Sequence, residues 1–203
     1  PAGHIDPGLY TQLLAKAYNA IKSANSSVAV ISGAPAPTGA EGAFGTDRVW
    51  NDDRYVRGMA AAGAAQYMDC VGAHYNEGIV SPRQTSGDPR GNYYTRYFWG
   101  MVNTYANAFG GARPICFTEL GYVTPEGLGP LPGGFDWGSG TSVAEQAQWL
   151  ADAVRLSRSS GRVRLVIIWN VDFTAYGGDP MAGYAIVRPD GSCPACAALG
   201  RIG

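Results

Sequence analysis

Apolar residues recur along this chain with two different spacings, which together predict alternating helices and strands. Near the start Leu9, Leu13, Ala17 and Ile21 repeat every four residues, the spacing of one face of an α-helix. Other segments are short and nearly continuously apolar, which is typical of strands buried on both faces. The pattern predicts helices over residues 9–24, 52–66, 94–109 and 143–159, and strands over residues 28–33, 68–74, 115–119 and 164–170.

The alternation of four strands with four helices predicts parallel strands covered by helices. An open doubly wound sheet and part of a (β/α)8 barrel both fit. A doubly wound nucleotide-binding fold has a glycine-rich phosphate turn after its first strand, whereas residues 33–38 lack that spacing and include two prolines, which have no amide donor. We therefore predict an α/β fold that is half of a (β/α)8 TIM barrel, with four parallel strands.

Length and charge narrow the range of partners. A chain of 203 residues with 46% hydrophobic content supports one core, so we predict one half-barrel domain over residues 1–189 and a tail, residues 190–203, packed on the same domain. A formal net charge of −1 without runs of like charge excludes an electrostatic nucleic-acid surface. No apolar stretch is long enough for a membrane span. The first residues resemble neither an initiator nor a secretion signal, so we expect the sequence to begin within a longer protein.

The four cysteines fall into two classes. Cys70 and Cys116 stand singly in apolar strand-like runs, which predicts buried, small apolar side chains. Cys193 and Cys196 form a Cys-Pro-Ala-Cys sequence near the end, for which a local disulfide, a free dithiol and half of a metal site are all open. One such pair is weak evidence for zinc, so we predict no metal and no cofactor.

Groups that suit sugar chemistry follow three of the predicted strands. The run Ile-Cys-Phe-Thr-Glu-Leu carries Glu119 just before Gly121, and a carboxylate there is costly unless it is paired or used in chemistry. Carboxylates perform glycoside hydrolysis, and an indole ring stacks on a sugar. The other strand ends supply His74, Tyr75, Asn76 and Glu77, and Trp169, Asn170 and Asp172. Each has an alternative role: Glu119 could cap a loop or pair with an arginine, Trp169 and His74 could be core residues, and Glu77 could be solvated.

These stretches resemble a known family. Residues 114–121, a strand ending in Thr-Glu followed by Leu-Gly, look like the seventh strand of clan A glycoside hydrolases, whose nucleophile is the Glu at its tip. Residues 72–75 and 167–170 resemble the sixth and eighth strands, and residues 9–33 resemble the fourth helix and fifth strand. The resemblance implies that Glu119 is a nucleophile, that His74 and Tyr75 lie near it, and that Trp169 floors the subsite of the cleaved sugar.

One departure from the family limits the expected activity. The family's acid/base is the Glu of an Asn-Glu pair on strand four, whereas Asn76-Glu77 lies one strand unit before Glu119, so we do not equate the two pairs. A retaining glycosidase needs two carboxyl groups about 5 Å apart. The resemblance therefore implies the C-terminal half of a retaining β-glycosidase, with Asn76 and Asn170 also at the sugar site, and inactive as an isolated chain.

The expected partners follow from this assignment. An oligo- or polysaccharide would be the substrate, and a missing N-terminal half barrel or a second half barrel would cover the open strand edges. We expect a secreted or cell-surface protein, although the cysteines alone leave the compartment open. The alternatives are a noncatalytic carbohydrate-binding or cell-wall-associated domain, and a structural or redox module that uses Cys193 and Cys196.

Overall fold

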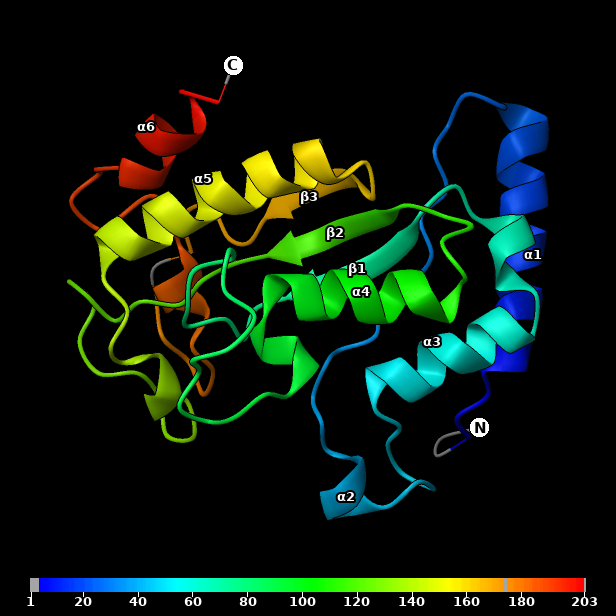
Figure 1. Ribbon diagram of the computed structural model, residues 1–203, viewed down its shortest axis with the longest axis horizontal. Helices are drawn as coiled ribbons and strands as arrows, with labels where there is room; N and C mark the ends of the chain where they lie inside the picture. The colour runs from blue at the N-terminus through cyan, green and yellow to red at the C-terminus, as the bar shows by residue number, and fades with distance from the viewer. Residues whose placement is uncertain (1–3, 174, 203) are drawn as a thin grey trace. The chain divides into compact units, whose positions relative to one another are not determined.

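The protein has an α/β fold with one open, three-stranded parallel sheet that alternates with helices. The computed structural model describes residues 4–173 and 175–202. The strands β1 (Val71–Tyr75), β2 (Ile115–Leu120) and β3 (Val163–Ile168) lie in sequence order, with β2 in the centre (Figure 1). The helices are α1 (Pro7–Ala24), α2 (Glu41–Phe44), α3 (Asp52–Ala61), α4 (Phe98–Ala108), α5 (Val143–Ser160) and α6 (Pro194–Leu199). Short 3-10 turns are η1 (Ala64–Tyr67), η2 (Tyr94–Arg96), η3 (Asp136–Gly138) and η4 (Met181–Tyr184).

The predicted first strand is the main difference from the expected architecture. Residues 28–33 form a single parallel bridge, between Ile31 and Cys70, instead of a fourth strand. The amide of Val30 donates to the carboxylate of Asp69 at 2.8 Å, so a side chain replaces a backbone acceptor of the sheet. The prediction of four strands was therefore wrong by one, because this segment is bridged only to Cys70, just before β1, and that pairing is too short to count as a strand.

The chain divides into two compact units, which are described separately. The first comprises residues 1–74, 102–116 and 162–165, and the second comprises residues 75–101, 117–161 and 166–203. In the first unit, α1 packs against α3 and η1. Gly58 permits this approach, because a Cβ atom there would lie 2.4 Å from the Pro7 side chain. Asp6 begins α1 by accepting a hydrogen bond from the amide of Leu9 at 2.9 Å.

Two predicted helices are broken in the structure. The helix predicted over residues 52–66 ends at Ala61 because Gly63 takes the left-handed conformation, with φ of 82°, and η1 follows it. The helix predicted over residues 94–109 starts as η2 and resumes as α4 at Phe98, because Tyr97 is extended. The predicted helices over residues 9–24 and 143–159 are present as α1 and α5.

A disulfide joins Cys70 to Cys116 within the first unit. Both side chains are buried, at 0% and 2% exposure, which agrees with the sequence prediction. Their covalent bond was not predicted, because each cysteine was interpreted by itself and neighbouring strands bring together residues that lie 46 positions apart.

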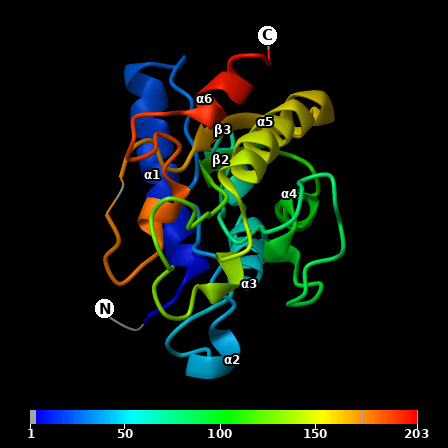
Figure 2. The same cartoon turned by 90° about the vertical axis from the view of Figure 1, so that its left-hand side faces the viewer.

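In the second unit, α5 is fixed at its start and along its length. Ser142 and Glu145 form a reciprocal capping box. The buried side chain of Gln146 donates to the carbonyls of Tyr122 at 2.7 Å and Gly183 at 3.0 Å. The tail helix α6 packs on α5, as Figure 2 also shows, and begins at Cys193, which forms a disulfide with Cys196.

Candidate functional site

The candidate site lies at the carboxyl ends of the strands and is carried by residues of the second unit. The strand register aligns these ends: the amide of Gly121 donates to Tyr75 and the amide of Trp169 donates to Leu120, each at 2.9 Å. Because the strands are parallel, the residues that follow β1 and β3 flank the end of β2. Alignment of the strands thus gathers groups that are distant in sequence.

Glu119 is held by an amide from the neighbouring strand end. The Asn76 Nδ2 atom donates to Oε2 of Glu119 at 2.9 Å, and both residues are partly buried. The Oδ1 atom of Asn76 is buried and accepts no hydrogen bond from the described residues. The Tyr184 hydroxyl donates to the Asn76 carbonyl at 2.6 Å. This arrangement fixes one carboxylate oxygen and leaves an amide oxygen with capacity to accept a donor.

Gly121 allows the strand ends to pack closely. A Cβ atom there would lie 2.4 Å from the Trp169 carbonyl oxygen and 2.7 Å from the Tyr184 ring, and 3.2 Å from Oδ1 of Asn76. No side chain larger than hydrogen fits without movement of these neighbours. Gly121 therefore has a specific steric role at the site.

Tyr75 is a core residue. Its side chain is 1% exposed and packs edge-on against Phe98 and Tyr122, with Phe117 also nearby. Burial raises the pKa of its phenol, and its hydroxyl donates to the Arg96 carbonyl at 3.3 Å. With a side chain that is 1% exposed, Tyr75 offers almost no surface to a bound sugar.

Trp169 and Asn170 have different surroundings, although they are adjacent in sequence. Trp169 is partly buried against a small cluster of Val123, Leu131 and Tyr184. Asn170 is 9% exposed: its amide nitrogen donates to the Met181 carbonyl at 2.7 Å, and its oxygen accepts from the Phe173 amide at 3.0 Å. Asn170 therefore closes the loop after β3, whereas Trp169 keeps an exposed part beside the site.

A second carboxylate, Glu77, lies in a polar network after β1. Its Oε2 atom accepts from the Thr95 hydroxyl at 2.6 Å, and its carbonyl accepts from the Arg90 guanidinium at 2.5 Å. Burial alone would raise the pKa of Asp88, but hydrogen bonds and charge from Arg90 outweigh it and hold that pKa below its ordinary value. The guanidinium of Arg90 also stacks on the Trp137 ring, 4.5 Å from its centroid.

The carboxylates of Glu77 and Glu119 both affect the pKa of Tyr184. Its pKa is raised first by burial and then by the negative charges of Glu77 and Glu119, while Arg90 opposes this shift. The phenol therefore stays protonated and can serve as a hydrogen-bond donor at neutral pH. Tyr184 and Arg90 were missed in the sequence, because Tyr184 lies in a terminal segment and Arg90 far along a loop, so neither stands at the end of a predicted strand.

His74 is partly buried near the end of β1, in the first unit. Among residues 4–173 and 175–202 no three His, Cys, Asp or Glu side chains are arranged to hold a metal ion. Within the same residues, no helix is long and apolar enough to cross a membrane.

No model of a known protein family matches this sequence, and no curated protein matches it.

Proposed function

We propose that this chain is a glycoside hydrolase-like domain, similar to the C-terminal half of a retaining β-glycosidase, in which Glu119 is the nucleophile. The observation that carries the proposal is the hydrogen bond between Asn76 and Glu119 at the aligned strand ends, with Trp169 on the adjoining strand end. A strand end is where catalytic groups of (β/α)8 enzymes reside. We propose accordingly that the chain is half of such a barrel.

Asn76 prepares Glu119 for nucleophilic attack. Its amide donor limits the rotation of the carboxylate, so that a carboxylate oxygen would be positioned to attack the anomeric carbon of a bound sugar. Attack would form an ester bond between that oxygen and the sugar, and the glycosidic bond would break with its electron pair going to the leaving oxygen. The exposed part of Trp169 would stack on the ring of the bound sugar.

Exposed apolar side chains at one edge of the open sheet are evidence for a partner that completes the site. On β3, which is an edge strand, Leu165 and Ile167 are 37% and 46% exposed, and Val171 and Phe173 after it are 56% and 57% exposed. A missing N-terminal half barrel, or a second copy of this chain, would cover these side chains. In the first case the partner would supply the acid/base carboxylate. The two disulfides support a secreted or cell-surface setting.

The nucleophile can be tested in this chain without the acid/base group. An aryl glycoside with a very good leaving group, such as a dinitrophenyl 2-deoxy-2-fluoro-β-glycoside, needs no protonation of the departing oxygen. Mass spectrometry after proteolysis should find one added glycosyl group on the peptide that contains Glu119. Glu119→Gln should abolish the label, and Glu77→Gln, which changes the nearby carboxylate held by Thr95, should retain it.

Two outcomes would reject this assignment. Labelling that persists in Glu119→Gln would place the nucleophile elsewhere, and failure of a panel of such glycosides to label the chain would remove the catalytic role. In the second case, oligosaccharide binding by calorimetry would favour a noncatalytic carbohydrate-binding domain. The partly exposed aromatic residues around the site, Phe135, Trp137, Trp169 and Tyr176, favour that second candidate because they can hold sugar without cleaving it.

A further inference from the structure

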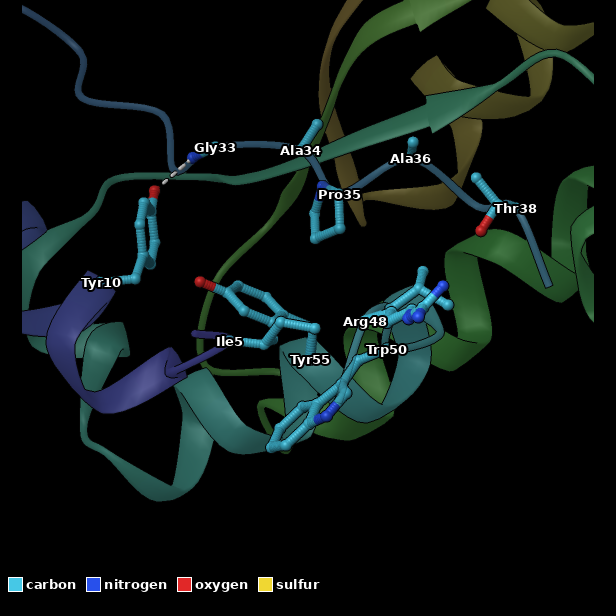
Figure 3. A pocket seen from close by; sticks show the side chains of 11 residues that line it. Ile5, Tyr10, Gly33, Ala34, Pro35, Ala36, Thr38, Arg48, Trp50 and Tyr55 are labelled. Atoms are coloured by element: carbon cyan, nitrogen blue, oxygen red, sulfur yellow. Dashed lines mark hydrogen bonds between the residues drawn. The ribbon is translucent and has the colours of Figure 1, made fainter. Parts of the chain in front are cut away.

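A cavity of about 400 Å³ lies wholly within the first unit, far in the sequence from Glu119. Its walls come from the start of α1, the loop after the Ile31 bridge, the segment that precedes α3, and Tyr55 in the first turn of α3. Figure 3 shows Pro35 and Tyr55 on opposite sides of the space, with Tyr10 at one end and Arg48 at the other. The volume is in the range of small-molecule sites.

Two of the aromatic walls are held in place before any ligand binds. The Tyr10 hydroxyl accepts a hydrogen bond from the Gly33 amide at 2.5 Å, and its ring centroid lies 6.1 Å from that of Tyr55. The indole nitrogen of Trp50 donates to the Thr46 carbonyl at 2.8 Å, and Arg54 stacks on the indole ring. Folding has therefore already ordered these rings, so ligand binding would not lose the conformational entropy of their side chains.

Two polar groups on the cavity are not used by the fold. The Arg48 side chain is exposed and forms no hydrogen bond or ion pair with any residue in the described part of the chain, whereas Arg54 and Arg57 each pair with a carboxylate. The Tyr55 hydroxyl likewise has no hydrogen-bond partner among residues 4–173 and 175–202. Burial raises the pKa of that hydroxyl, so it remains a donor at neutral pH.

We propose that this cavity binds a small ligand in which a six-membered ring carries a carboxylate. The ring would lie between Pro35 and Tyr55, and the carboxylate would accept two hydrogen bonds from the planar guanidinium of Arg48. Two ligand classes share this chemistry, a uronic acid unit of a saccharide and an aromatic acid. The site is independent of the proposed nucleophile, because all its residues belong to the first unit.

The test uses the whole chain and two matched ligand pairs, and binding is followed by calorimetry and by tryptophan fluorescence, to which Trp50 in the cavity contributes. Methyl glucuronoside is compared with methyl glucoside, and benzoate with benzyl alcohol. Each pair keeps the ring and differs in the carboxylate. An acid should bind at least 10-fold more tightly than its neutral counterpart, and the preferred acid identifies the ligand class.

The variant Arg48→Gln should remove this preference without lowering the melting temperature, because the side chain is exposed and unpaired within the described chain. Arg57→Gln, on the same unit but paired with Asp53, is the matched control and should keep the preference. Equal binding of acid and neutral ligands, or an acid preference that survives Arg48→Gln, would overturn the proposal. A lack of binding by all four ligands at millimolar concentration would also overturn the proposal. A dimer that dissociates in the Tyr55→Ser variant would do the same, because a second copy of the chain would then occupy the cavity.

Discussion

Removal of the disulfide between Cys70 and Cys116 should destabilise the protein strongly. The two cysteines are 46 residues apart, and both side chains are buried at the start of neighbouring strands. In the chain-entropy description, closure of a loop of that length stabilises the folded state by about 4 kcal/mol. A domain has a total stability of about 5–15 kcal/mol, so the double variant Cys70→Ala/Cys116→Ala should lose a large part of it.

The control is the disulfide between Cys193 and Cys196, which encloses a loop with a sequence separation of 3. The same description assigns it about 2 kcal/mol, so Cys193→Ala/Cys196→Ala should be the milder variant. Urea unfolding followed by circular dichroism gives both free energies. Equal losses in the two double variants, or a loss below about 1 kcal/mol for the Cys70 pair, would refute the loop-length argument.

Two further predictions concern single residues. Gly121→Ala should lower stability by about 1–3 kcal/mol, because its Cβ would overlap the Trp169 carbonyl, whereas Gly140→Ala, which has open space around it, should have little effect in the same thermal melts. Asp152→Asn should cost about 1 kcal/mol at pH 7, because hydrogen bonds from Arg83 hold the Asp152 pKa below its ordinary value. A carboxyl group whose pKa is depressed in the folded state stabilises the protein above its unfolded pKa, and it loses this effect as the pH falls through the folded pKa. The penalty of Asp152→Asn should therefore shrink toward pH 2 in urea titrations. A penalty that is constant with pH would contradict this role.

Local sequence signals predicted the parts of the fold that depend on neighbouring residues. The apolar spacing of residues 9–24 and 143–159 defined α1 and α5. The continuous apolar run that ends at Glu119 defined β2. Each of these signals involves contacts within four residues or alternation along one strand, so a single segment contains the information.

Tertiary structure decided what depends on long-range pairing. The apolar, β-branched run over residues 28–33 has the composition of a strand, but its pairing is limited to one bridge, to Cys70 just before β1, and the Asp69 side chain takes the Val30 amide. Likewise the cysteines in two strands were both predicted to be buried, while their bond depends on how those strands align. The residue types in a segment do not determine which distant residue its backbone groups or thiols will bond to.

The candidate site divides in the same way. The sequence by itself determined that a carboxylate, Glu119, stands at the end of an apolar strand, and that Asn76 and Trp169 lie at the ends of two other predicted strands. The fold decided that Asn76 holds that carboxylate, that Tyr75 is sealed in the core, and that Tyr184 joins the site from a distant segment. The physical reason is that residue type and strand position are local properties, whereas the direction and partner of a side chain at a strand end depend on register and packing across the sheet.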